Sequence, residues 1–360
     1  MKRKLVYILA LLLVFTLPLF GYQEVLREDR SLRSAQELSD LLRTAFESVS
    51  SEIYFSVDQS QPWFNAALIN EKILEAAWSS ISGGLFFDHY SYSTKGRSDT
   101  AIIFVSMTIV YTFPRTQIIS IVEQTDQKAA SMVAALIKPE MDDYEKELVL
   151  HDGLVQAANY DSYAFSTGRD GPGTHTPYGV LIEGKGVCDS FSKAFLMLAS
   201  KAGIECLIVQ GTARGNKHSW NLVRIDGSWY HLDVTYDDPV SQKKEVTHDY
   251  FNLTDDIIAV NHKWKRDTVP ACTSSEENWF EVEKLVVQDF SNLRTILKAS
   301  FDHRLPNICE RIINFNPSTF ETELQAAIDT TETRAKSKVA GYSYSYDNDI
   351  GTLTLVVKYK

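Results

Sequence analysis

The sequence predicts an α+β fold in which a middle region with reactive residue types is flanked by two similar small α+β units. Two observations support this prediction. The first and last regions both show, in the same order, the patterns of a helix, a strand, a helix and two strands. The middle region opens with helical periodicity and ends in strands. We divide the chain into residues 1–21, 22–115, 116–275 and 276–360.

Residues 1–21 have the layout of a signal peptide. Met1–Lys4 is basic, and the apolar run Leu5–Phe20 is short for a membrane-spanning helix. Gly21 offers a small residue for cleavage. The sequence therefore predicts export to the periplasm, the cell surface or the medium, with no membrane span in the mature chain. An uncleaved membrane anchor is the alternative.

Charge and cysteine content restrict the function classes. Removing the signal peptide changes the net charge from −11 to −14, because Lys2, Arg3 and Lys4 are lost. An acidic chain without a cluster of Lys and Arg argues against a nucleic-acid partner. Its four cysteines are too few for the disulfide framework of an exported protein. Cys272 with Cys309 is the one bridge that we consider, and the sequence does not fix it.

The first unit begins with a helix. Ser34 and Glu37 form a capping box in front of apolar residues that recur at helical spacing from Leu38 to Val49. The elements that we expect after it are a strand at Ile53–Val57, a helix at about Pro62–Trp78, and strands at Phe86–Ser93 and Ala101–Phe113.

The last unit repeats this order. Its expected elements are a helix at Ser291–Phe301, a strand at Ile308–Phe315, a helix after Pro317, strands at Val339–Tyr346 and Thr352–Tyr359, and an extra strand at Phe280–Val287. The segments His89–Ser93 and Gly341–Ser345 both alternate aromatic residues and Ser. We interpret the two units as an internal duplication that serves as scaffold.

The middle region contains a candidate nucleophile, Cys188. It follows the loop Gly184–Val187 and precedes a helical pattern that runs from Phe191 to Ala202 and ends at Gly203. The free N–H groups and the positive dipole of a helix start favour a thiolate. An inert cysteine at the start of a core helix is equally compatible with this position.

A candidate base and its orienting acid follow Cys188. His218 opens an alternating strand that continues to Ile225, and the turn Asp226-Gly227 predicts a hairpin with a second strand, Ser228–Tyr236. Asp233 lies in that second strand, where Asp is disfavoured. Pairing with His218 would explain it. Cys188, His218 and Asp233 therefore have the chemistry and the order of a nucleophile, a base and an orienting carboxylate.

We expect no metal and no cofactor. His231 shares a strand face with Asp233, but no further ligand follows at a useful spacing, so a structural role is favoured. The chain has no HExxH, phosphate-binding loop, GxSxG or CxxC motif.

Three segments carry a family resemblance. Residues 178–191, 218–221 and 229–239 resemble the cysteine, histidine and aspartate segments of bacterial transglutaminase-like proteins. Tyr250–Leu253 followed by His262 is similar to what comes after the core in that family. The resemblance covers about Asp142 to His262. One departure is Ser190, where Gly is frequent in the family.

The resemblance implies a papain-like core, in which the cysteine helix packs on an antiparallel sheet that carries His218 and Asp233. It also implies acyl transfer from a glutamine side chain or a peptide through a Cys188 thioester, with a protein or peptide substrate. Crosslinking, deamidation and hydrolysis stay open, because the acceptor is an amine or water. The backbone N–H of Cys188 is a candidate oxyanion donor. Tyr178 and Trp220 are candidate cleft residues, with packing as the alternative. A non-catalytic binding or scaffold protein of the bacterial envelope is the competing hypothesis.

Overall fold

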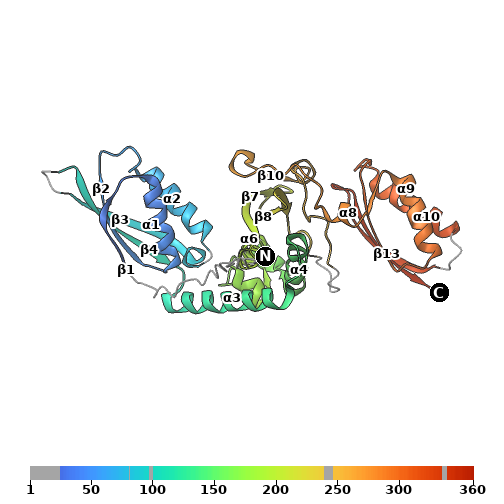
Figure 1. The fold of residues 1–360 in the computed structure, drawn as a ribbon, viewed down its shortest axis with the longest axis horizontal. Coiled ribbons are helices and arrows are strands. Elements are labelled where there is room, and N and C mark those ends of the chain that lie inside the picture. Colours follow the sequence, from blue (N-terminus) through green and yellow to red (C-terminus); the bar gives the residue numbers. More distant parts are fainter. Residues whose placement is uncertain (1–24, 81, 97–99, 239–245, 335–338) are drawn as a thin grey trace, which may run out of the picture. The chain divides into compact units, whose positions relative to one another are not determined.

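The computed structural model describes residues 25–80, 82–96, 100–238, 246–334 and 339–360 (Figure 1). The expected signal peptide, residues 1–21, lies outside this range. The chain forms two compact units, the first ending at Ile119 and the second beginning at Ser120. None of the helices built from the described residues has the length and apolar character needed to span a bilayer.

The first unit is a four-stranded sheet with two helices. Its sheet has the order β1-β2-β4-β3, with β1 parallel to β2 and the other neighbours antiparallel. The elements are β1 (Val25–Leu32), α1 (Ala35–Glu47), β2 (Glu52–Asp58), α2 (Ala66–Ser79), a 3-10 turn (Gly83–Phe86), β3 (Phe87–Gly96) and β4 (Ile102–Tyr111).

Two details of the first unit differ from the sequence prediction. Strand β1 was not predicted. Helix α2 begins four residues later than expected, because the side chain of Asn65 accepts the N–H of Leu68 and caps the helix there. The start of α1 agrees with the prediction, since the hydroxyl of Ser34 accepts the N–H of Glu37 at 3.2 Å.

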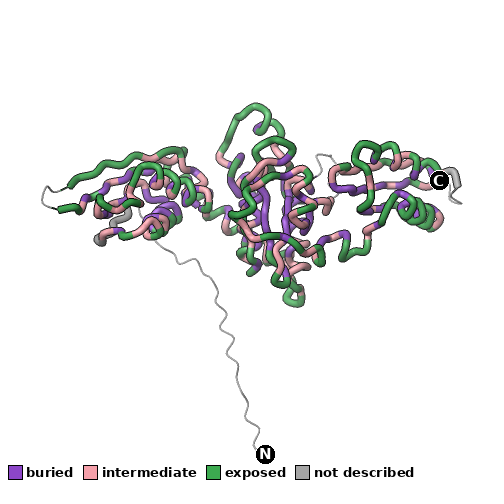
Figure 2. The backbone as a smooth tube through the Cα atoms, turned by 90° about the horizontal axis from the view of Figure 1, so that it is seen from above, coloured by how far each residue is buried: buried purple, intermediate pink, exposed green. Residues whose placement is uncertain are grey.

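The second unit opens with the domain that carries the candidate site, and its first helix, α3, begins within the last residues of the first unit. Its elements are α3 (Arg115–Leu136), α4 (Asp143–Ala157), β5 (Asn159–Tyr160), α5 (Ser162–Thr167), a π-helical turn (Gly179–Glu183), β6 (Lys185–Gly186), α6 (Cys188–Ala202), β7 (Glu205–Ala213), β8 (Asn216–Ile225), β9 (Ser228–Leu232), α7 (Asp255–Ile258) and β10 (His262–Trp264). Helix α6 packs against β7 and β8 of the antiparallel sheet β10-β7-β8-β9. In Figure 2 this region shows long buried stretches of chain.

The predicted hairpin between β8 and β9 is present. Asp226 and Gly227 form its turn with φ values of 47° and 86°, the left-handed conformation that such a turn requires. The second strand ends at Leu232, however, and not at Tyr236 as expected. Asp233 accepts N–H groups of the residues that follow it, which turns the chain out of the sheet.

The C-terminal part has the same topology as the first unit. Its elements are α8 (Trp279–Val282), β11 (Val286–Val287), α9 (Phe290–Asp302), β12 (Asn307–Ile312), α10 (Phe320–Arg334), β13 (Val339–Asp347) and β14 (Thr352–Tyr359). The sheet order is β11-β12-β14-β13, again with one parallel pair at the same edge.

The extra strand expected at Phe280–Val287 is mostly absent. Phe280 is instead buried within the short helix α8. Lys284, with a φ of 59°, then ends the helical segment and directs the chain into β11, which has only two residues.

We predict that Phe46→Ala destabilises the first unit by about 3–5 kcal/mol, because it leaves a cavity in the core. Phe46 is fully buried and packs edge-on against Phe87 and Tyr111 at ring distances of 5.6 and 6.4 Å. Amide hydrogen exchange of β2, followed by mass spectrometry, measures the loss. Leu74→Ala is the control, since Leu74 is 50% exposed. Equal exchange in the two variants would contradict the prediction.

Candidate active site

Cys188 is the first residue of α6, as predicted. The helix start is fixed from the preceding turn: the N–H of Val187 donates to the carbonyl of Thr174 at 3.1 Å. Ser190, which occupies the position where the family frequently has Gly, is fully buried and donates its hydroxyl to the carbonyl of Thr174 at 2.6 Å. The unusual serine therefore anchors the cysteine helix, and the N–H of Cys188 lies at the helix end.

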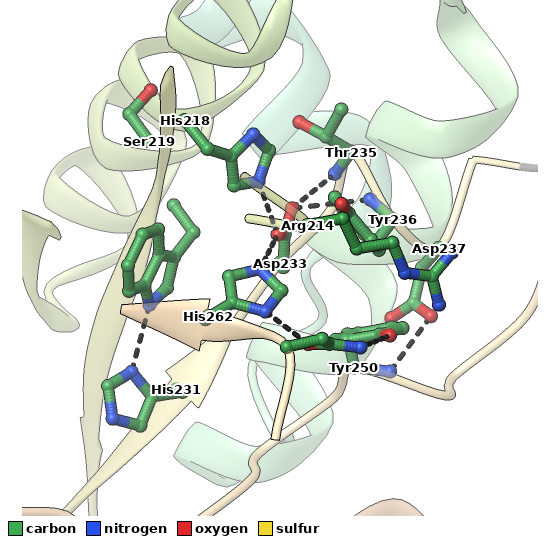
Figure 3. Close-up of polar contacts among 12 residues, drawn as sticks. Arg214, His218, Ser219, His231, Asp233, Thr235, Tyr236, Asp237, Tyr250 and His262 are labelled. Carbon is green, nitrogen blue, oxygen red and sulfur yellow. Dashed lines mark hydrogen bonds and ion pairs between the residues drawn. The ribbon is translucent and has the colours of Figure 1, made fainter. Parts of the chain in front are cut away.

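His218 and Asp233 are brought together by the hairpin. Nε2 of His218, on β8, lies 2.6 Å from Oδ2 of Asp233, just beyond β9 (Figure 3). The thiol of Cys188 lies close enough to His218 to raise the pKa of its imidazole. Because one ring nitrogen faces Asp233, the other is left for the thiol, which is the arrangement that an activated cysteine needs.

Asp233 is almost fully buried, with 1% of its surface exposed, and its carboxylate is densely hydrogen-bonded. Oδ1 accepts the backbone N–H groups of Thr235 and Tyr236 at 3.0 and 3.2 Å. Oδ2 also accepts a hydrogen bond from a second imidazole, through Nε2 of His262 at 3.0 Å. In the sequence, His262 was identified only as part of the segment that resembles the family. The sequence did not predict this contact, which joins residues 29 positions apart.

The electrostatics favour an ion pair. Burial raises the pKa of Asp233, but the charges and hydrogen bonds of His218 and His262 outweigh it and hold the pKa well below its usual range. Burial lowers the pKa of His218, but the charge of Asp233 and hydrogen bonds to Asp233 and Cys188 raise it to about 10. His218 is therefore a protonated imidazolium at neutral pH, between two partners that can carry negative charge.

Trp220 differs from the expectation of a cleft or oxyanion residue. It is buried, and its indole N–H donates to Nδ1 of His231 at 2.9 Å, so it cannot also donate to a substrate oxygen. Its ring stacks on His218 at 5.9 Å, where it restricts the imidazole. Tyr178 is half-buried beside the π-helical turn.

A groove of about 310 Å³ opens beside His218. Its lining combines aromatic, cationic and acidic side chains from β5, α5, the two strands of the β7–β8 hairpin and the turn after Asp233. The lining residues are Tyr160, Phe165, Ala213, Asn216, Lys217, His218, Thr235, Tyr236 and Asp238. Neither Tyr178 nor Trp220 is among them. The groove is large enough for a polar side chain together with adjoining peptide backbone.

Three groups of described residues bring potential metal ligands within 4.8 Å of one another: His151 with Asp152 and His248, His218 with Asp233 and His262, and His231 with Asp255 and Cys272. In each group, hydrogen bonds join the histidines to the carboxylate. In the last group, Nδ1 of His231 accepts from Trp220, so Nε2 carries the proton that it donates to Asp255 at 2.9 Å. That nitrogen has no lone pair to offer a cation.

A second buried ionic network supports the turn after Asp233. His151, fully buried on α4, contacts Asp237 through Nε2 at 3.2 Å and Asp152 through Nδ1 at 2.9 Å. Burial lowers the pKa of His151, but these two carboxylates outweigh it and raise the pKa to about 9. Asp237 also accepts the N–H of Tyr250 at 3.0 Å, which fixes one end of the groove wall.

The geometry agrees with a family match. Residues 130–234 match the family model described as "Transglutaminase-like superfamily", and this range contains Cys188, His218 and Asp233. Residues 130–234 are a transglutaminase-like domain. The helix α6 packed on an antiparallel sheet is the fold that the sequence predicted for it. A search of curated proteins finds no match to this chain.

Similar solved structures include three proteins. One is described as a TGase, with 14% identity over 54% of this chain and 53% of that chain and a TM-score of 0.30. A candidate cysteine protease from Cytophaga hutchinsonii has 14% identity over 41% and 65%, with a TM-score of 0.25. A candidate protease from Parabacteroides distasonis has 10% identity over 50% and 39%, with a TM-score of 0.26. The chain thus covers less than two thirds of the length of each.

We predict that iodoacetamide labels Cys188 rapidly at about pH 6, where a thiol with an ordinary pKa of about 8.5 is largely protonated. The reason is the imidazolium of His218, which stabilises a thiolate. His218→Ala should slow the labelling strongly. Mass spectrometry of the Cys188 peptide measures the rate, and Cys309 serves as the internal control because burial raises the pKa of its thiol to about 12. Similar rates in the wild type and His218→Ala would contradict the ion pair.

We predict that the extra stability given by His151 depends on pH. Because its pKa is raised above the ordinary value of about 6.5, the contribution is complete below that pH and disappears as the pH rises through about 9. The free energy of unfolding of the wild type should therefore exceed that of His151→Gln by about 1.5–3 kcal/mol below pH 6.5. Above about pH 9 the difference should be much smaller. Urea unfolding at a series of pH values measures the difference, from which titrating groups remote from His151 cancel. A difference that is constant across this range would contradict the assignment.

Proposed function

We propose that the chain is an exported thiol enzyme that acts on amide bonds of proteins or peptides through a Cys188 thioester. The observation that carries this proposal is the pairing of His218 with Asp233 at 2.6 Å, beside Cys188 and with His218 in the lining of a groove. The match to the transglutaminase-like superfamily supports the reaction class. The basic and apolar segment at residues 1–21 supports export.

The first half of the reaction forms the thioester. The Cys188 thiolate attacks the carbonyl carbon of a glutamine carboxamide or a peptide bond, and the carbonyl oxygen becomes negatively charged. The N–H of Cys188, at the positive end of α6, is placed to stabilise this oxygen. The imidazolium of His218 gives its proton to the nitrogen as the C–N bond breaks, so ammonia or an amine leaves.

The second half transfers the acyl group. Neutral His218 takes a proton from water or from an amine, which then attacks the thioester carbonyl, and the C–S bond breaks to regenerate the Cys188 thiolate. Water gives deamidation or hydrolysis, and a lysine amine gives crosslinking. Asp233 keeps Nε2 of His218 occupied throughout, so that the other nitrogen exchanges the proton.

The groove supports a substrate of peptide character. The aromatic rings of Tyr160, Phe165 and Tyr236 offer apolar contact, whereas Lys217 and Asp238 offer opposite charges within the same lining. A mixed lining of this kind suits a polypeptide segment better than a uniformly apolar or uniformly charged ligand.

We predict that the wild-type chain, incubated with an acid-soluble protein digest and a primary amine, acylates Cys188 and modifies amides in the digest. Mass spectrometry distinguishes the three outcomes: conversion of Gln to Glu, incorporation of the amine, or new peptide termini. Cys188→Ala should abolish all of them, because the nucleophile is removed. Cys309→Ala, which removes a thiol far along the sequence from the site, should leave them unchanged.

Two results would contradict the proposal. One is modification that persists at the wild-type level in Cys188→Ala. The other is the absence of any acyl adduct and any amide modification by the wild type while the chain is folded. The second result would favour the hypothesis of a non-catalytic binding or scaffold protein.

A further inference from the structure

The turn between β13 and β14 belongs to the C-terminal part of the chain but enters the transglutaminase-like domain. Ile350 in this turn is only 4% exposed and joins the hydrophobic cluster that contains Trp220 and Leu222. Trp220 in turn stacks on His218. The turn is therefore packed into the wall behind the candidate site.

Two carboxylates of the turn contact Arg214. Oδ2 of Asp347 lies 2.7 Å from Nη2 of Arg214, and Oδ2 of Asp349 lies 3.2 Å from Nε. The guanidinium also lies over Tyr236, 5.5 Å from the ring centroid. Arg214 is 49% exposed, so solvent weakens these ion pairs, and they do not by themselves explain the position of the turn.

The buried side of the same turn orients an amide. Nδ2 of Asn261 donates to Oδ2 of Asp349 at 3.1 Å and to the hydroxyl of Tyr250 at 2.7 Å, and that hydroxyl donates to Asp347 at 2.8 Å. A reversed amide would place its oxygen against the Asp349 carboxylate. Asp349 therefore fixes which way the Asn261 amide faces.

The oriented amide holds His262. Oδ1 of Asn261 accepts Nδ1 of His262 at 2.6 Å, and the opposite nitrogen, Nε2, lies 3.0 Å from Oδ2 of Asp233. Oδ2 of Asp233 is the atom that also accepts His218 at 2.6 Å. His262 is 1% exposed. The groups that face or approach it are Asp233, His218, His231, Tyr236 and Tyr250, with Arg214 beyond Tyr236.

We propose that the β13–β14 turn of the C-terminal unit is a positioning element of the candidate active site. Asp349 fixes Asn261, Asn261 fixes His262, and His262 holds Asp233 against His218. Asp349 and Asn261 are positioning residues, since neither touches the reacting thiol. The proposal rests on the proposed function, because it gives the turn a role in the same hydrogen-bonded series.

The consequence concerns activation of Cys188. In Asp349→Asn the new amide can donate to Asn261, so the Asn261 amide is free to reverse and present N–H groups to His262. His262 then loses the oxygen that its Nδ1 faces, so its ring is less firmly fixed against Asp233. A less restrained Asp233 stabilises the His218 imidazolium less well, so His218 activates the thiol of Cys188 less effectively.

The test is the pH dependence of iodoacetamide labelling of Cys188 in the full chain. We expect Asp349→Asn and Asn261→Ala each to slow labelling at about pH 6 by about tenfold and to move the labelling midpoint to higher pH. Asp256→Asn, which removes an exposed carboxylate on α7 of the same domain, should label like the wild type. The double variant Asp349→Asn/Asn261→Ala should label Cys188 no more slowly than the slower single variant, because the two residues act in series.

Several results would overturn the proposal. Labelling of Asp349→Asn at the wild-type rate and with the wild-type midpoint would do so. A double variant whose labelling slows by the product of the two single effects would also do so. If Asp349→Asn fails to fold, Asn261→Ala tests the same series from its other end. His218→Ala separates this proposal from the proposed function: if only His218→Ala slows labelling, the thiol is activated but the turn plays no part, whereas unchanged labelling in His218→Ala contradicts the proposed function itself.

Discussion

The buried carboxylate of Asp233 is the constraint on which the rest of the site depends. A carboxylate removed from water is costly unless hydrogen bonds and opposite charge replace the lost hydration. Here His218, His262 and the N–H groups of Thr235 and Tyr236 supply them. The hydrogen bonds to this carboxylate coincide with the end of β9 at Leu232. They require His262, which the pairing of β10 with β7 places beside Asp233. They also orient the imidazole of His218 that faces Cys188. The catalytic geometry and the local fold follow from the same requirement.

Much of this arrangement could be predicted from the sequence, because local signals carry it. A cysteine after a glycine-rich loop, a helical pattern behind it, and Asp in an apolar strand are readable over short distances, and they predict the helix, the hairpin and the series of Cys188, His218 and Asp233. The remainder depends on distant contacts. Asn261 and Asp349 are 88 positions apart, and no local pattern joins them. Trp220 was expected as a candidate cleft residue, with packing as the alternative. The sequence could not show that the indole N–H of Trp220 donates to His231 on the other strand of the hairpin.

The site is enclosed by two ionic networks with different surroundings. The network of His151, Asp152 and Asp237 lies on α4 and the turn after Asp233, where His151 is wholly buried. The network of Arg214, Asp347 and Asp349 is partly exposed. Removing one partner of a buried pair leaves an uncompensated charge, so such a pair restricts how its residues can be arranged. The first network thus defines the position of the groove wall, and the second joins that wall to the C-terminal unit.

The two small units illustrate how a shared fold can carry different roles. Their sheets have the same strand order and directions, yet their hairpin turns differ in charge. In the last unit the turn contains Asp347 and Asp349, which accept hydrogen bonds from Arg214, Tyr250 and Asn261. In the first unit the sequence of the corresponding turn is Lys95-Gly96-Arg97-Ser98-Asp99, with two cations and one acid. By sequence, that segment carries one carboxylate where the last unit has two. The contact with the site therefore comes from a few turn residues, and the topology that both units share does not by itself provide it.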